Sequence, residues 1–279
     1  MTRFAPFAAL LAAACSPLTL FNGIVPKDGG VRRTAGLAYG EGPRRMLDVY
    51  APRRGADRTR PVLVFFYGGS WNAGDRAGYG FVGRALAARG FVTIVPDYRL
   101  VPETSYPGFV EDGAAAVRWA RANAGRWGGD GDRIVLAGHS AGAYIAAMLA
   151  VDARWLGADR QAVRGLIGLA GPYDFAPFTA PAARAAFGAW PDPAETQPVS
   201  HAGAGDPAAL LLTGAEDMTV RPRNSEALAA SLRQAGTPAE VKAYPGIGHV
   251  GILTAIARPL RGRAPVVDDM AAFADRVTR

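Results

Sequence analysis

Residues 138–142 read Gly-His-Ser-Ala-Gly, a G-x-S-x-G pattern that places Ser140 between two glycines. The motif stands between an apolar run, residues 134–137, and an alanine-rich stretch of helical period, residues 141–153. A strand that turns sharply into a helix exposes the serine hydroxyl above the sheet edge, and the glycines relieve the crowding of that turn. Free N–H groups at the helix start favour an oxyanion there. The motif predicts a nucleophilic serine; the alternative is an ordinary strand–helix turn that happens to contain serine.

A serine hydroxyl needs a base that removes its proton, and the chain has three histidines. His139 adjoins the serine, where the turn points its ring away from the hydroxyl, so we expect it to pack. His201 precedes the predicted strand 208–213, whereas the base of this arrangement normally follows the acid in sequence. His249 lies on a predicted loop just after the last predicted strand. We therefore predict His249 as the base, with His201 as the alternative.

The base needs an orienting carboxylate, and Asp217 lies just past the predicted strand 208–213. Open α/β sheets place their sites at the carboxyl ends of strands. Asp174, after the preceding strand, and Glu216 are alternatives, ranked after Asp217 in that order. The resulting chain order of serine, acid and histidine is that of the α/β-hydrolases, and it differs from the orders in chymotrypsin and subtilisin.

A glycine-containing segment, residues 67–71 (Tyr-Gly-Gly-Ser-Trp), follows the predicted strand 62–67. Two glycines let the backbone turn so that successive N–H groups point at one oxygen. We predict an oxyanion hole built from the N–H groups of Gly69, Ser70 and Ala141. The alternative is a plain glycine turn after a strand.

Short apolar runs rich in β-forming residues alternate with longer alanine- and arginine-rich stretches of helical period. This pattern predicts an α/β fold with a mostly parallel central sheet and helices on both faces. The predicted strands are residues 46–50, 62–67, 91–96, 134–137, 165–170, 208–213 and 239–244, and the predicted helices are 79–89, 107–124, 141–153 and 223–234.

A segment rich in proline and aromatic residues, 171–205, interrupts this alternation. Long irregular segments in compact domains are typically functional, so we expect a small lid-like insertion or pocket wall. Trp71 and Tyr173 are the predicted substrate-contacting residues. Core packing is the alternative for both, because aromatic residues are equally common in cores.

The composition bounds the class of protein. The chain has 279 residues, of which 49% are hydrophobic and 20% charged, which is typical of a globular protein with a large core. Its net charge of +7 comes from scattered arginines with no basic run or zinc spacing, so we do not expect nucleic-acid binding. The single cysteine excludes an internal disulfide and a multi-cysteine metal site.

The N-terminus has the pattern of a short signal peptide, residues 1–14, with Arg3 before an uncharged apolar stretch. The junction 11–15, Leu-Ala-Ala-Ala-Cys, resembles a bacterial lipobox, in which Cys15 would carry the lipid and tether the protein to a membrane. Cleavage without lipid and an uncleaved helix are the alternatives. We expect an exported protein, periplasmic or membrane-anchored, with a cytoplasmic location as the alternative. Residues 15–44 are then an N-terminal extension, and residues 45–279 the catalytic domain.

From about residue 45 to the C-terminus the chain resembles bacterial carboxylesterases of the α/β-hydrolase superfamily, of the hormone-sensitive-lipase-like and feruloyl-esterase-like types. The resemblance is carried by residues 67–71, 97–103 (Asp-Tyr-Arg-Leu-Val-Pro-Glu) and 138–142, with Asp217 and His249. It implies a serine carboxylesterase that hydrolyses small esters without metal or organic cofactor. It also implies a structural role for Asp97 and Arg99.

The chain departs from the family at the oxyanion loop, which the family usually opens with histidine and often builds with a third glycine. Tyr67 and Ser70 stand there instead. The donors are backbone groups, so the hole should survive this change. The related arylformamidases carry a similar loop, which leaves amide hydrolysis as an alternative function and a non-catalytic interaction module as a more remote one.

Overall fold

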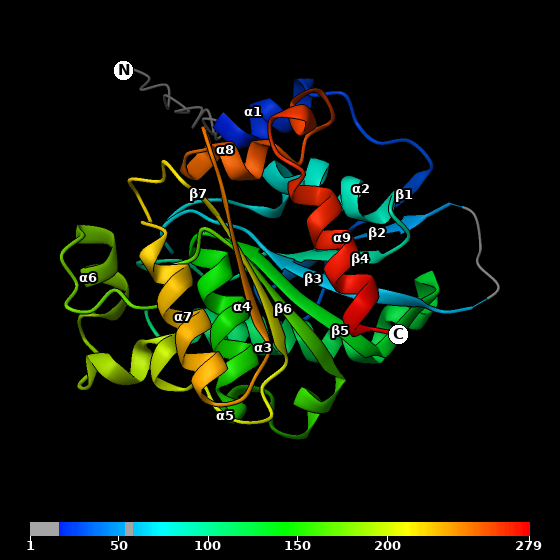
Figure 1. The fold of residues 1–279 in the computed structure, drawn as a ribbon. Helices are drawn as coiled ribbons and strands as arrows, with labels where there is room; N and C mark the ends of the chain where they lie inside the picture. The colour runs from blue at the N-terminus through cyan, green and yellow to red at the C-terminus, as the bar shows by residue number, and fades with distance from the viewer. Residues whose placement is uncertain (1–16, 54–57) are drawn as a thin grey trace, which may run out of the picture.

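The computed structural model describes residues 17–53 and 58–279, in which strands and helices alternate (Figure 1). The strands are β1 (Val31–Ala38), β2 (Met46–Pro52), β3 (Arg60–Phe66), β4 (Val92–Pro96), β5 (Gly129–His139), β6 (Val163–Leu169), β7 (Ala208–Gly214) and β8 (Ala239–Tyr244). The α-helices are α1 (Pro17–Ile24), α2 (Gly80–Ala87), α3 (Gly108–Asn123), α4 (Ala141–Val151), α5 (Ala153–Leu156), α6 (Pro181–Phe187), α7 (Arg223–Gln234), α8 (His249–Thr254) and α9 (Val266–Val277).

The strands form one eight-stranded sheet in the order β1-β2-β4-β3-β5-β6-β7-β8. β2 is antiparallel to both β1 and β4, and all other neighbouring strands are parallel. The central strands are nearly continuous apolar runs because helices cover both of their faces. The edge strand β8 instead mixes buried and exposed positions. Because the strands β3 to β8 are parallel to one another, their carboxyl ends lie along one edge of the sheet.

Helices cover the sheet in two layers. α2 and α9 pack on one face, and α3, α4 and α7 pack on the other (Figure 1). Every residue of α4 is buried, which its alanine- and glycine-rich sequence permits. α9 is amphipathic, with its buried side chains at helical spacing and two aspartates in its first turn.

The seven predicted strands correspond to β2–β8, and the predicted α/β fold with a mostly parallel sheet and helices on both faces is confirmed. The predicted domain start at residue 45 is wrong, because β1 pairs with β2 and belongs to the same sheet. β1 is mostly exposed, with only Val31 buried, so it lacks the pattern of a buried strand. Helices α1, α5, α6, α8 and α9 were also not predicted.

The predicted signal peptide, residues 1–14, and Cys15 lie outside the described residues. Within the described ranges, no helix is both long and apolar enough to cross a membrane.

Candidate active site

Ser140 lies in a strained turn between β5 and α4, with φ 53° and ψ −122°. A left-handed φ is unfavourable for any residue with a Cβ atom, so the surroundings must hold it. Its N–H donates to the Leu169 carbonyl of β6 at 2.8 Å, and its carbonyl accepts from Tyr144 N–H at 3.1 Å. A Cβ atom at Gly142 would lie 2.1 Å from the Phe66 carbonyl oxygen. Glycine at this position therefore lets α4 begin directly against β3, which presents the serine side chain at the sheet edge.

Ser140, His249 and Asp217 form a continuous line of hydrogen-bonded side chains. His249 Nε2 lies 2.9 Å from Ser140 Oγ, and His249 Nδ1 lies 2.7 Å from Asp217 Oδ2. Asp217 Oδ1 accepts from the backbone N–H groups of Thr219 and Val220 at 2.9 and 2.8 Å. Because an ionised carboxylate only accepts, Nδ1 of a neutral imidazole carries the hydrogen and Nε2 is left to accept from the serine hydroxyl. This is the tautomer that a general base requires.

Direct backbone contacts bring Asp217 and His249 together. The loops after β7 and β8 run side by side: Ala215 N–H donates to the Tyr244 carbonyl at 2.9 Å, and Glu216 N–H to the Ile247 carbonyl at 3.0 Å. A Cβ atom at Gly214 would lie 2.1 Å from that Ile247 oxygen, so glycine is needed for the approach. His249 is the first residue of α8 and does not lie on a free loop as predicted.

The loop of residues 67–71 packs against the serine turn. A Cβ atom at Gly68 would lie 2.8 Å from His139 Nδ1 and 3.0 Å from Ser140 Cβ. Gly69 has φ 139°, and a Cβ atom there would lie 2.1 Å from the Ala73 carbonyl oxygen. Both glycines are therefore required, the first by a close approach and the second also by its backbone conformation.

This loop supplies unused donors beside Ser140. The N–H groups of Gly69, Ser70 and Trp71 have no hydrogen-bond acceptor within residues 17–53 and 58–279, and Ala141 is the first residue of α4. Ser70, Trp71 and Ala141 line the same pocket as Ser140, whereas Gly69 does not line it. The Trp71 N–H is a candidate donor that the sequence analysis missed, because left-handed φ values at Ser70 and Trp71, 52° and 60°, have no signal in these residue types.

Gly69→Ala tests the loop geometry. The new Cβ atom meets the Ala73 carbonyl, so the loop must shift and its N–H groups move away from the oxyanion position. We expect kcat for an ester substrate to fall by about 10²-fold, as when one oxyanion donor is lost. The matched control is Gly125→Ala, where a Cβ atom meets nothing within 4 Å. Equal activity of the two variants would contradict a role for this loop.

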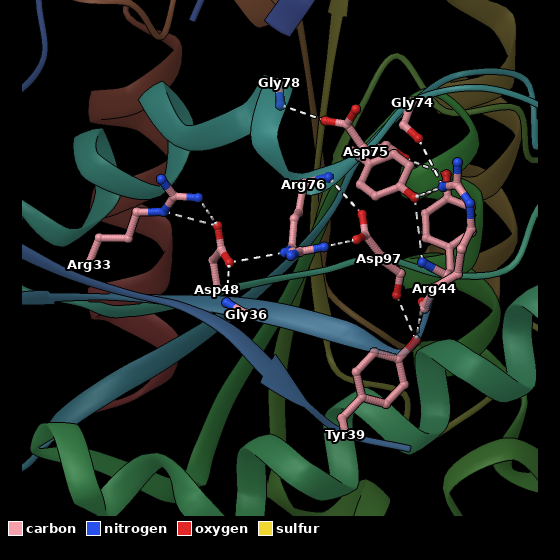
Figure 2. Close-up of polar contacts among 12 residues, drawn as sticks. Arg33, Gly36, Tyr39, Arg44, Asp48, Gly74, Asp75, Arg76, Gly78 and Asp97 are labelled. Carbon is pink, nitrogen blue, oxygen red and sulfur yellow. Dashed lines mark hydrogen bonds and ion pairs between the residues drawn. The ribbon is translucent and has the colours of Figure 1, made fainter. Parts of the chain in front are cut away.

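A chain of charged side chains braces the segment that follows the loop (Figure 2). Arg76 bridges two buried carboxylates: its Nε donates to Asp48 at 3.0 Å, and its Nη1 pairs with Asp97, which also accepts from the Arg76 N–H at 2.7 Å. Asp48 in turn accepts from Arg33 and from the Gly36 N–H. β1, β2 and β4 are thereby tied to the segment that follows the loop.

Arg44 connects this bracing to the loop itself (Figure 2). Its Nη1 donates to the Tyr67 hydroxyl at 3.1 Å and to the Gly74 carbonyl at 3.0 Å, so it joins the first residue of the loop to the segment that follows it. Tyr98 stacks on Tyr67 with ring centroids 4.4 Å apart, and its hydroxyl donates to the Tyr67 carbonyl at 2.7 Å. Tyr67, which replaces the histidine usual in the family, is thus a buried anchor of the loop.

The structural role expected for Asp97 and Arg99 agrees with their contacts. Asp97 pairs with Arg76, and Arg99 makes a two-pronged contact with buried Asp112 of α3, at 2.8 and 2.9 Å. Asp112 also pairs with Arg45 of the segment before β2. None of these side chains lines the pocket of Ser140.

His139 is buried and does more than pack. Its Nε2 lies 3.1 Å from the backbone carbonyl of His249 and donates to it, while Nδ1 faces the Tyr79 hydroxyl at 3.5 Å. That hydroxyl accepts from the Gly68 N–H at 3.0 Å. Burial, with a smaller contribution from nearby His249, lowers the pKa of His139 to about 3, so its ring is neutral near pH 7. His139 thus links the oxyanion loop and the serine turn to the start of α8, where His249 lies.

The lowered pKa of His139 predicts a loss of stability in acid. The unfolded chain binds a proton at this residue below about pH 6.5, whereas the folded protein resists it down to about pH 3. The free energy of unfolding therefore keeps its full value above about pH 6.5. It falls as the pH drops from about 6.5 to about 3, by at most about 1.4 kcal/mol per pH unit. His139→Gln keeps a donor for the His249 carbonyl but cannot titrate. Urea unfolding at about pH 7, 6 and 5 should show a shallower acid loss in this variant; equal slopes would contradict the assignment.

A pocket of about 440 Å³ opens at Ser140, within the size range of small-molecule sites. Residues from the segment 171–205 form one wall, as predicted, and the loop after β7 forms another. Trp71 lines the pocket and stacks on Phe175 with ring centroids 5.9 Å apart. The predicted substrate contact of Tyr173 is wrong in this structure: its side chain is fully buried against Gly168 and Gly171 and does not line the pocket.

The alternative residues lie elsewhere. His201 Nε2 bonds the Glu195 carbonyl at 2.7 Å, and its ring faces Asp152. Asp174 and Glu216 are exposed, and neither carboxylate is bonded to His249. Across the residues that the structure describes, no group of three or more histidine, cysteine, aspartate or glutamate residues could hold a metal ion.

A mostly parallel sheet with a serine after β5, an acid after β7 and a histidine after β8, joined by hydrogen bonds, defines the α/β-hydrolase fold. The fold is shared with esterase B of Lactobacillus rhamnosis, with a TM-score of 0.80 at 20% identity over 93% of this chain and 90% of that one. The chain belongs to the BD-FAE family, whose model matches residues 47–232, two thirds of its length. His249 lies beyond the matched segment.

Two relatives illustrate the similarity in sequence. Esterase LipC of Mycobacterium tuberculosis is 40% identical over 119 residues, which is 42% of this chain and 29% of LipC. A probable isoprenylcysteine alpha-carbonyl methylesterase of Oryza sativa is 29% identical over 258 residues, 84% of this chain and 62% of that protein. The chain therefore spans less than two thirds of the length of these relatives.

Proposed function

We propose that this protein is a serine carboxylesterase that hydrolyses small carboxylic esters through an acyl-enzyme intermediate. The observation that carries the proposal is the hydrogen-bonded line from Asp217 through His249 to Ser140, which lines a pocket. The esterase names of relatives and structural neighbours support it.

In this mechanism Ser140 Oγ attacks the ester carbonyl while His249 Nε2 takes the hydroxyl proton. Asp217 holds the imidazole tautomer and stabilises its charged form. The N–H groups of Gly69, Ser70 and Ala141, with Trp71 as the added candidate, stabilise the oxyanion. Collapse of the tetrahedral intermediate breaks the bond to the alkoxy oxygen, which takes the proton from His249 and leaves as the alcohol. Water, deprotonated by His249, then attacks the acyl-serine, and Ser140 regains its proton as the carboxylic acid departs.

The test is hydrolysis of p-nitrophenyl esters from acetate to laurate, with Ser140→Ala as the blank. The walls of the pocket enclose about 440 Å³, so we expect kcat/KM to fall for the longest acyl chains. A paired phenyl ester and formanilide distinguish the esterase from an arylformamidase, because amide cleavage needs a poorer leaving group to be protonated. Faster turnover of the formanilide would overturn the ester assignment.

A further inference from the structure

Arg221 and Arg223 are the only charged residues among the described residues that line the pocket of Ser140, and no acidic side chain lines it. We propose that the esters cleaved at this site carry an anionic group, a carboxylate or a phosphate, which Arg221 and Arg223 bind. This inference rests on the proposed esterase function and specifies its substrate class.

Neither guanidinium group is paired with an acidic side chain in the described part of the chain. Elsewhere in the described chain many arginines are in ion pairs, as Arg76 is with Asp48 and Arg261 with Asp28. Arg221 and Arg223 are exposed, and neither side chain has an acidic partner or a hydrogen-bond acceptor within the ranges that the structure describes. Two unneutralised cations in one concave site attract anions.

Folding does not account for the two arginines. Arg223 is the first residue of α7, where the positive end of the helix dipole disfavours a cation. The last turn, where a cation is favoured, holds Arg233. The guanidinium groups of Arg221 and Arg223 are exposed and make no ion pair or hydrogen bond within the described residues. They therefore add no polar contact that would stabilise the folded state.

Hydrogen bonds on both sides anchor the segment that carries the arginines. Asp217 Oδ1 accepts from the N–H groups of Thr219 and Val220, so the carboxylate that orients His249 also anchors the chain leading to Arg221. Beyond it, the buried Asn224 Oδ1 accepts from the N–H groups of Tyr173 and Asp174, both at 3.0 Å. These bonds hold the arginine segment against the wall formed by residues 171–205.

The rest of the lining is uncharged and mostly apolar. Trp71, Phe175 and a row of alanine and proline residues suit a hydrocarbon or aryl portion. The pocket therefore combines an apolar wall with a cationic one, which matches an ester that is neutral at the scissile bond and anionic at a distance from it.

The experiment compares kcat/KM within pairs of esters that differ in charge but little in reactivity. One set is the butyrates of 4-methylphenol, 4-(carboxymethyl)phenol and 4-(phosphonomethyl)phenol, which place no charge, a carboxylate or a phosphonate on the alcohol side. The other is p-nitrophenyl hexanoate and the p-nitrophenyl half-ester of adipic acid, which test the acyl side. The proteins are wild type, Arg221→Gln/Arg223→Gln, Arg221→Lys/Arg223→Lys, and the charge-matched control Arg32→Gln/Arg53→Gln, whose exposed arginines do not line the pocket.

We expect wild type to have a higher kcat/KM for the charged ester than for the neutral one in at least one pair. In the glutamine double variant, the ratio of these two kcat/KM values should be roughly tenfold lower. The lysine variant should retain most of the ratio, the control should match wild type, and about 0.5 M salt should weaken the preference. The pair that responds identifies carboxylate or phosphate and the side of the ester that carries it. A ratio in the glutamine variant equal to that of wild type in every pair, or faster turnover of every neutral ester by wild type, overturns this inference alone. No turnover of any ester overturns the proposed function as well.

Discussion

Replacing Ser140 by alanine is expected to lower kcat for p-nitrophenyl acetate by about 10⁶-fold, the scale seen when the nucleophile of a Ser-His-Asp enzyme is removed. The hydroxyl is 2.9 Å from His249 Nε2, and no other described side chain takes this position. The backbone strain at φ 53° is the same for alanine as for serine, so the variant should fold. Initial rates from stopped and continuous assays, with active-site titration of wild type, measure the loss.

The matched control for this change is Ser200→Ala, at an exposed serine outside the pocket. It should retain wild-type kcat, and thermal unfolding should show that both variants are folded. A folded Ser140→Ala protein with more than a tenth of wild-type kcat would show that another group carries out the attack.

Asp217→Asn is expected to lower kcat by about 10⁴-fold while leaving KM nearly unchanged. Its Oδ1 can still accept from the Thr219 and Val220 N–H groups, so the loop should keep its shape. The amide NH₂, however, donates toward His249 Nδ1 and selects the tautomer with hydrogen on Nε2. That imidazole cannot accept the serine proton.

Glu216→Gln removes the neighbouring exposed carboxylate and is the control for Asp217→Asn. We expect it to retain wild-type kcat. Should Glu216→Gln cause the larger loss, the orienting acid would be Glu216, which the sequence analysis ranked below Asp217.

The positions of Ser140, Asp217 and His249 were predictable because each depends on a short local pattern at the end of a strand. The serine lies in a glycine-containing turn between an apolar run and a helical stretch, the acid follows the next strand but one, and the histidine follows the last strand. In a parallel sheet, these positions leave few ways to combine a nucleophile, an acid and a base. The succession of the central strands along the chain follows from the same apolar runs, whereas their order in the sheet, with β4 between β2 and β3, was not predicted. β1 was missed because it is a mostly exposed edge strand, and only its pairing with β2 shows that it belongs to the sheet.

The remaining features depend on contacts between residues far apart in the sequence. Nothing near His139 indicates that its ring donates to the His249 carbonyl, and nothing near Arg221 indicates that it lines the pocket of Ser140. Tyr173 was assigned to the pocket because its segment is aromatic, but its ring turns inward against Gly168 while Phe175 lines the pocket instead. Tertiary packing decides which side chains of a loop face a cavity, and no periodic pattern in the sequence indicates it.

The most direct test of the central claim is covalent labelling with an alkyl fluorophosphonate, followed by intact mass and peptide mapping. The fluorophosphonate phosphorus takes the place of the ester carbonyl carbon, so attack by an activated serine leaves a stable tetrahedral adduct. We predict one adduct per chain, located on Ser140, absent from Ser140→Ala and formed far more slowly by Asp217→Asn. Stoichiometric labelling of another residue, or no labelling of folded wild type, would contradict the assignment of Ser140, His249 and Asp217 as the catalytic residues.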